Sequence, residues 1–153
     1  MEKIDAHSVK QRKIPLLFAP EHFDDLEDYV PWCEVYELDR EAELELQSEV
    51  RLLLDGRGLG IALPAQKSYF YVSSIDIQAR IKAGRRGELA RACLGNKDSM
   101  RVLDAFAGFG VDGLTLAGLG ADVTLVERNL VVWLMLRSIA CGHPRVAIHY
   151  ADS

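Results

Sequence analysis

Apolar and polar residues follow a regular pattern in the second half of this chain. Short apolar runs alternate with longer amphipathic runs that end at glycine or proline. Strands are expected at residues 100–104, 121–127 and 146–150, and helices at residues 112–119 and 129–140. Asn129 is expected to cap the second helix, and Gly120 to end the first. Alternation of strand and helix at this spacing predicts a parallel sheet with crossover helices.

The first half has shorter and less regular runs. Strands are expected at residues 14–18, 32–38 and 70–72, helices at residues 21–29, 75–83 and 88–94, and a hairpin at residues 50–63. The sequence therefore predicts an α/β chain in two parts. Residues 1–97 form a small α+β region with antiparallel hairpins, and residues 98–153 form the first three parallel strands of a doubly wound sheet.

The chain has 153 residues, of which 49% are hydrophobic. Its charged residues are distributed unevenly along the sequence. The net charge of -5 argues weakly against nucleic-acid binding. Residues 21–49 nevertheless hold twelve acidic residues and one base, Arg40, whereas residues 80–101 hold seven bases and two acidic residues. This asymmetry bears more on the choice of partner than the total does.

Several classes of protein are not expected. The longest apolar stretch, residues 130–136, is too short to cross a membrane, and the first residues lack the apolar core of a secretory signal. The three cysteines, Cys33, Cys93 and Cys141, are odd in number and far apart, so a reducing cytoplasm is the simplest interpretation. The histidines lack ligand spacing, and no metal site is expected.

One group of residues carries chemistry: Asp104, Gly108, Gly110 and Asp112, with Glu127 after one helix and one strand. Glycines at a strand-to-helix turn let the backbone approach a ligand closely, and the helix N-terminus offers unpaired N–H groups to an anion. An acidic residue at the end of the second strand, about twenty residues later, can accept both ribose hydroxyls. The pattern predicts a nucleoside-containing cofactor at the ends of the strands.

Two cofactors are candidates for this site, NAD and S-adenosylmethionine. Gly108, Gly110 and Gly113 also satisfy the dinucleotide pattern G-x-G-x-x-G, so an NAD-dependent oxidoreductase is one alternative. Asp104 ends the first strand four residues before Gly108, and a pyrophosphate would sit poorly beside Asp104 and Asp112. S-adenosylmethionine (SAM), with its sulfonium and ammonium groups, suits these carboxylates better. Asp152 follows the third strand, where it could reach the adenine amine, and Ser153 lies beside it.

The run VLDAFAGFGVDGLTLAGLGADVTLVERNLVV resembles the RsmJ-type small-subunit rRNA guanine-N2 methyltransferases of bacteria, which are class I SAM-dependent enzymes with a Rossmann-like sheet. The segments LLLDGRGLGIAL and AGRRGELARACLG resemble the family's hairpin and its basic glycine-rich stretch. The resemblance thus covers residues 50–153. It implies SAM as cofactor, cytoplasmic small-subunit (16S) rRNA as partner, and the exocyclic N2 of a guanine as methyl acceptor.

The resemblance also implies individual contacts. Cofactor contacts fall on Val111, Asp112, Glu127, Arg128, Asp152 and Ser153, besides Asp104, Gly108 and Gly110. Val111 stands where the family usually has Arg, which leaves only backbone contacts there. In the basic segment, Arg85 and Arg86 are the candidates for RNA phosphates, since Arg offers a planar fork to phosphate oxygens.

The family's later strands and their amine-holding, proline-containing acidic motif have no counterpart in this chain. We therefore expect it to be a fragment of a longer enzyme that does not transfer methyl groups by itself, with no catalytic residue of its own. A non-catalytic truncated paralogue that binds RNA or a partner is a further alternative.

Overall fold

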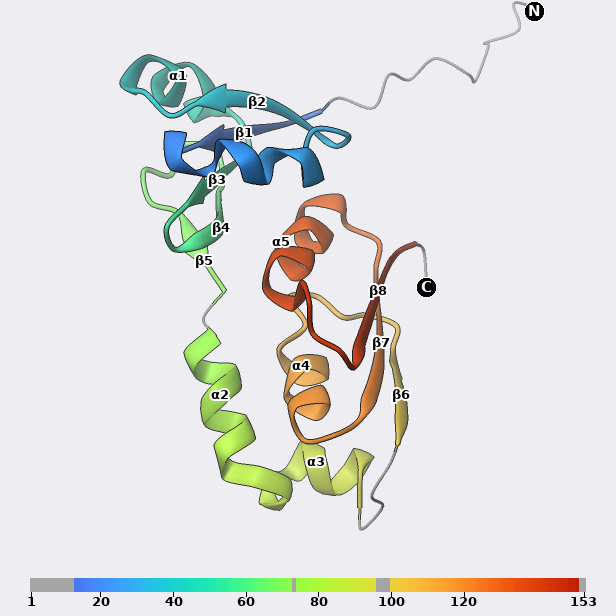
Figure 1. The fold of residues 1–153 in the computed structure, drawn as a ribbon. Helices are drawn as coiled ribbons and strands as arrows, with labels where there is room; N and C mark the ends of the chain where they lie inside the picture. The colour runs from blue at the N-terminus through green and yellow to red at the C-terminus, as the bar shows by residue number, and fades with distance from the viewer. Residues whose placement is uncertain (1–12, 73, 96–99, 152–153) are drawn as a thin grey trace, which may run out of the picture. The chain divides into compact units, whose positions relative to one another are not determined.

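The computed structural model describes residues 13–72, 74–95 and 100–151 (Figure 1). Contacts divide the chain into two compact units. Unit 1 comprises the residues up to Gly56 together with Ile61–Tyr69, and unit 2 comprises Arg57–Gly60 and the residues from Phe70 onward. This division lies earlier than the one expected between residues 97 and 98, because helices before residue 98 pack into the core of unit 2. The boundary of independently folding domains stays a prediction.

A five-stranded sheet with the order β2-β1-β3-β4-β5 organises the first half of the chain. Its strands are β1 (Ile14–Phe18), β2 (Cys33–Glu37), β3 (Arg51–Asp55), β4 (Gly58–Ala62) and β5 (Phe70–Tyr71). Strand β1 pairs in parallel with both β2 and β3. The expectation of antiparallel hairpins therefore does not extend to β1, whereas β3 and β4 are neighbours joined by two residues, as in a hairpin.

Short helices connect the parallel strands of this sheet. They are η1 (Pro20–Asp28), α1 (Arg40–Glu45) and η2 (Leu46–Ser48). The sequence predicted a helix near η1 but not α1, which Asp39 caps by accepting a hydrogen bond from the Ala42 N–H at 2.7 Å. Leu16, Leu17 and Leu52 are fully buried. Since adjacent residues of a strand point to opposite faces, both faces of β1 are covered.

Unit 2 holds a three-stranded parallel sheet with the order β6-β7-β8, as predicted. The strands are β6 (Arg101–Asp104), β7 (Asp122–Glu127) and β8 (Val146–Tyr150). The helices are α2 (Ser74–Ala83), η3 (Gly84–Arg86), α3 (Glu88–Cys93), α4 (Val111–Gly118) and α5 (Leu130–Ala140). Asn129 caps α5, and its side chain accepts from the N–H groups of Val131 and Val132 at 3.0 and 3.2 Å.

The helices of unit 2 cover one face of its sheet. Figure 1 shows α4 and α5 on the same side of β6, β7 and β8. Leu114 of α4, Leu125 of β7 and Leu136 of α5 belong to one buried cluster, which Ile77 of α2 joins. Leu103 on β6 remains 67% exposed, so the described residues leave the opposite face open. No helix of the described chain has the length and apolar character needed to cross a membrane.

Candidate cofactor-binding site

The glycine-rich turn lies between β6 and α4, where the sequence predicted it. Gly108 and Gly110 have φ angles of 53° and 73°, values that residues with a side chain adopt at a cost. The Gly110 N–H donates to the Ala107 carbonyl at 2.7 Å, which closes the turn, and Gly110 is the N-cap of α4. No side chain caps this helix. The N–H groups of its first turn therefore lack partners within the helix.

Close packing holds the start of α4 against the sheet. A Cβ at Gly110 would lie 2.3 Å from Cδ1 of Leu136, and a Cβ at Gly113 would lie 2.3 Å from Cδ2 of Leu125. Space therefore favours glycine at both positions, and at Gly110 the turn favours it as well. Together they place the uncapped end of α4 beside the carboxyl ends of the strands, where ligands of open parallel sheets bind.

Glu127 ends β7 and is tied to the glycine turn by both of its carboxylate oxygens. Oε2 accepts from the Gly108 N–H at 3.0 Å, and Oε1 accepts from the Asn129 N–H at 2.7 Å. The side chain is half-buried. Each carboxylate oxygen has two lone pairs, so both can accept a further hydrogen bond. The backbone therefore holds Glu127 in a fixed position with capacity left for a ligand's hydroxyls.

Two further carboxylates lie at this end of unit 2. Asp104 ends β6, the strand next to β7, and its Oδ1 accepts from the Phe106 N–H at 3.2 Å. Asp112, in the first turn of α4, forms an ion pair with Arg80 of α2 at 2.6 Å. Asp104 is half-buried whereas Asp112 is exposed, so the Asp104 charge is the less screened of the two.

The remaining predicted contacts differ in their surroundings. Val111 packs against the core of unit 2, so its side chain serves the helix, and only its backbone is free to meet a ligand. Arg128 is exposed directly after β7. Asp152 and Ser153 lie outside the described residues.

The sequence places Phe106 and Phe109 in the glycine turn, where they could flank a ligand. The rings of Phe109 in the turn and Phe70 of β5 are 5.6 Å apart, while Phe106 is 78% exposed. Near the end of β8, Tyr150 packs against Trp133 of α5 at 5.5 Å. No periodicity links the members of either ring pair along the chain, so the pairing depends on the fold.

Five of the seven bases of residues 80–101, the basic segment, lie on α2, η3 and α3. Arg85 and Arg86 end η3; Arg85 is half-buried and Arg86 is exposed. The Arg80–Asp112 ion pair connects this segment to the first turn of α4, and a Cβ at Gly118 would lie 2.3 Å from Cδ1 of Ile81. Helix α2 therefore packs along α4, with basic residues close to the glycine turn.

The donor set has a definite chemical character. Within the part of the chain that the structure describes, no cluster of three or more His, Cys, Asp or Glu side chains could hold a metal ion. The site instead offers two carboxylates on adjacent strand ends and the N–H groups of an uncapped helix. Such a set suits a ligand that carries a cationic group, hydroxyl groups and a carboxylate.

Comparison with known proteins gives a consistent result. The model of a family described as "Putative SAM-dependent methyltransferase" matches residues 37–140. Ribosomal RNA small subunit methyltransferase J from Thioalkalivibrio sulfidiphilus is 46% identical over 94 residues, which cover 56% of this chain and 36% of that protein. The protein of the same name from Alkalilimnicola ehrlichii is 46% identical over 68 residues, which cover 41% of this chain and 26% of that protein. The matched regions thus span about a third of these relatives or less.

A solved structure supports the fold. The SAM-dependent methyltransferase from Neisseria gonorrhoeae superposes with a TM-score of 0.62 at 18% identity and covers 90% of this chain and 60% of its own. At this level of identity the likeness concerns the fold alone. It confirms the expectation of a Rossmann-like α/β sheet.

Proposed function

The chain belongs to the family of putative SAM-dependent methyltransferases, and on that premise we propose that it supplies the cofactor-binding part of an rRNA methyltransferase. The proposed reaction transfers a methyl group from SAM to the exocyclic N2 of a guanine in small-subunit rRNA. The names of the two relatives from Thioalkalivibrio and Alkalilimnicola support the rRNA substrate.

The observation that carries this proposal is the position of Glu127. Its carboxylate is fixed by the N–H groups of Gly108 and Asn129, at the end of a parallel strand and beside an uncapped helix. A carboxylate held this way can accept both hydroxyls of a ribose without reorganising, because the backbone has already oriented it.

The other residues fit the remaining groups of SAM. Asp104 offers a half-buried carboxylate to the ammonium group, and the first-turn N–H groups of α4, at Val111 and Asp112, face the methionine carboxylate. Gly108 and Gly110 place no side chain at the two left-handed positions of the turn, and exposed Arg128 borders the site. Asp152 and Ser153 would complete the adenine side. A pyrophosphate at the start of α4 would meet the carboxylates of Asp104 and Asp112, so NAD fits this donor set less well.

Bound SAM supplies an electrophilic methyl group on a sulfonium sulfur. The residues of this chain contribute binding and orientation: Glu127 fixes the ribose end, and Asp104 fixes the amino-acid end. Catalysis of this kind rests on alignment and exclusion of water and needs no covalent enzyme intermediate.

The basic segment supports RNA as partner. Arg85 and Arg86 lie on the element that follows α2, and Arg80 of α2 reaches the first turn of α4. Phosphates bound there would run beside the cofactor site. Contacts with phosphates do not depend on the nucleotide sequence, and they position the nucleic acid on the protein.

Calorimetric titration of this 153-residue chain with SAM and, separately, with NAD tests the proposal. We expect saturable binding of SAM at one site and no comparable binding of NAD. Tighter binding of NAD than of SAM would contradict the cofactor assignment and favour the oxidoreductase alternative.

A further inference from the structure

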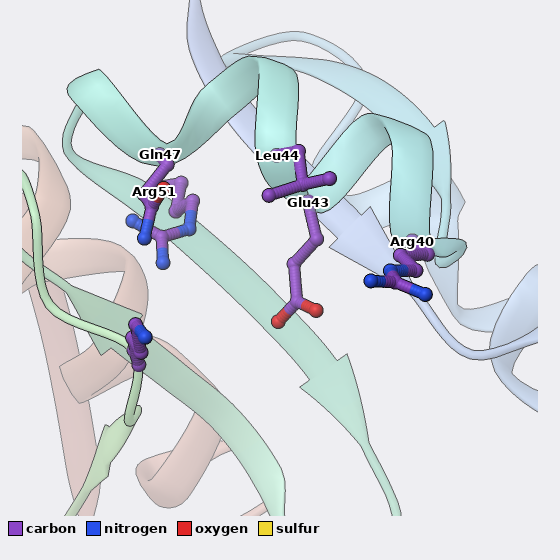
Figure 2. Close-up of a pocket in the computed structure, with 6 residues that line it drawn as sticks. Arg40, Glu43, Leu44, Gln47 and Arg51 are labelled. Atoms are coloured by element: carbon purple, nitrogen blue, oxygen red, sulfur yellow. The ribbon is translucent and has the colours of Figure 1, made fainter.

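Unit 1 contains a pocket of its own, with a volume of about 220 Å³. It lies beside α1, η2 and the start of β3 and is lined by Arg40, Glu43, Leu44, Gln47, Arg51 and Lys67. Figure 2 shows Gln47 with Arg51 at one end, Arg40 at the other end and Glu43 between them. None of these residues belongs to the glycine turn or the basic segment, and neither the motifs nor the family resemblance assigned them a role.

Arg51 is the unusual member of the pocket, because it is a charged side chain that is only 2% exposed. Its Nε donates to the Tyr69 hydroxyl at 3.1 Å, and one terminal nitrogen donates to the Gln66 carbonyl at 2.6 Å. The other terminal nitrogen, Nη1, is buried and has no hydrogen-bond partner. A buried donor without a partner is costly, and such an atom calls for an explanation.

Among the described residues, Arg51 forms no ion pair. Burial raises the pKa of Tyr69, although the adjacent Arg51 lowers it in part, so the phenol stays protonated at neutral pH. The described residues place no carboxylate within ion-pair distance of Arg51, Arg40 or Lys67. A buried guanidinium without a counter-ion marks a place where an anion would be stabilised.

The distribution of bases in unit 1 also favours an anion in this pocket. Residues 13–56 and 61–69 contain four bases, Lys13, Arg40, Arg51 and Lys67. Three of them line this one pocket, in a unit whose residues 21–49 are otherwise strongly acidic. Glu43 is the one carboxylate among the lining residues, so the pocket is net positive. An anion bound in the pocket would stabilise the three cations that line it.

We infer that this pocket binds the phosphate group of a phosphomonoester. A phosphomonoester carries a charge of about -1.5 to -2 at neutral pH, which matches the excess of cations over Glu43. Arginine forks bind phosphate oxygens in a bidentate manner, and Lys67 adds a point charge. The proposal requires the Gln47 side chain, which lines the pocket together with Arg51, to move aside so that a phosphate oxygen reaches Nη1. The carrier is a free phosphorylated molecule or the phosphorylated end of an RNA.

This inference goes beyond the proposed methyltransferase function and does not depend on it. The pocket lies in unit 1, whereas the cofactor residues lie in unit 2. Phosphate binding here and SAM binding at the glycine turn can therefore succeed or fail separately.

Titration of the isotopically labelled chain with inorganic phosphate at constant ionic strength tests the inference by NMR. We expect a saturable shift of the Arg51 side-chain Nε–H signal. Arg40→Gln and Lys67→Gln should each weaken phosphate binding about threefold to tenfold, the range for losing one charged hydrogen bond at a partly exposed site. Glu43→Gln should strengthen binding. Arg51 itself is left intact, because its bonds to Tyr69 and Gln66 support the fold.

Lys13→Gln is the matched control, since it removes the same charge from the same unit outside the pocket and should leave the affinity unchanged. Dimethyl phosphate, a singly charged diester, should bind at least tenfold more weakly than phosphate. A 5′-phosphorylated RNA tetramer that binds more tightly than phosphate identifies an RNA end as the carrier, and equal affinity identifies a free molecule. Absence of a saturable Arg51 shift, equal loss in Lys13→Gln, or equal binding of the diester would each overturn the inference.

Discussion

The two units of this molecule place charge in opposite ways. Unit 1 has an acidic sequence, yet it buries the Arg51 guanidinium and gathers two more bases around it. Unit 2 carries most of the bases, yet its strand ends present the carboxylates of Asp104 and Glu127. In each unit the local site has the sign opposite to that of the surrounding sequence. The difference teaches that charge totals along a segment do not reveal what the segment binds.

The sheets of the two units also differ in how they are covered. In β1 the adjacent residues Leu16 and Leu17 are both fully buried, whereas in β6 Leu103 is 67% exposed. Parallel sheets are usually buried on both faces. Unit 1 meets that condition along β1, and unit 2 meets it on the face that α4 and α5 cover. The covered face of unit 2 is the one that positions the glycine turn.

The largest effect is expected from Gly110→Ala in unit 2. The substitution places a side chain at a φ of 73° and a Cβ 2.3 Å from Leu136. Backbone strain and overpacking together should lower the free energy of unfolding by about 2–4 kcal/mol. Chemical denaturation measures this. Gly87→Ala, at a glycine with ordinary backbone angles and open space, is the control and should cost less than about 1 kcal/mol. Equal effects in both variants would show that the turn is not tightly packed.

The next largest effect is expected at the acidic site of unit 2. Glu127→Ala should weaken SAM binding by about 1.5–3 kcal/mol, the range for hydrogen bonds to a charged group. Calorimetry on the folded variant measures the loss. Glu88→Ala removes an equal charge from an exposed position of α3 and should bind SAM as the parent does. Unchanged affinity of Glu127→Ala would end the assignment of this residue to the ribose.

A smaller effect tests the RNA-binding role of unit 2. The double change Arg85→Ala, Arg86→Ala should reduce the slope of log affinity against log salt by about 0.7 for each lost contact with single-stranded RNA. Affinity for SAM should not change. Titrations at several salt concentrations provide the slopes.

Arg145→Ala is the comparison for this test. Arg145 pairs with Asp122 at the opposite end of the strands from the glycine turn, so its loss should leave the slope as it was. If the slope of log affinity against log salt stays the same in the double variant, the basic segment is an ordinary solvated surface that does not bind RNA.

The smallest effect concerns the link between α2 and α4. Arg80 and Asp112 are 52% and 59% exposed, so their ion pair should contribute only about 0.2–1 kcal/mol to stability. A double-mutant cycle with Arg80→Ala and Asp112→Ala measures the coupling, and high salt should reduce it. A coupling of several kcal/mol would mean that the pair is shielded from solvent and is a major anchor of the basic segment.

Much of unit 2 could be predicted from the sequence because its signals are local. The glycine turn, the Asn129 cap and the strand–helix alternation each lie within a few residues of the feature they specify. The two hydrogen bonds that Glu127 accepts, from the N–H groups of Gly108 and Asn129, could not be predicted. They depend on how the turn folds back on β7.

Unit 1 was harder to predict for a physical reason. The parallel pairing of β1 with β2 and β3 joins residues far apart in the chain, and no short pattern records it. Helix α1 is short and polar, and Asp39 was its one clear signal. The pocket combines Arg40, Arg51 and Lys67 from separate segments. A base at the start of the apolar run RLLL was the signal that could have drawn attention to Arg51.

The central claim is that the glycine turn and the end of β7 form the SAM site. The most direct test is a titration of the ¹⁵N-labelled chain with SAM, followed by backbone amide shifts in NMR spectra. We predict that the largest saturable shifts fall on the amides of residues 108–112 and 127–129, because Gly108, the first turn of α4, Glu127 and Asn129 line the proposed site. Saturable shifts confined to other residues, or an absence of saturable shifts, would contradict the account.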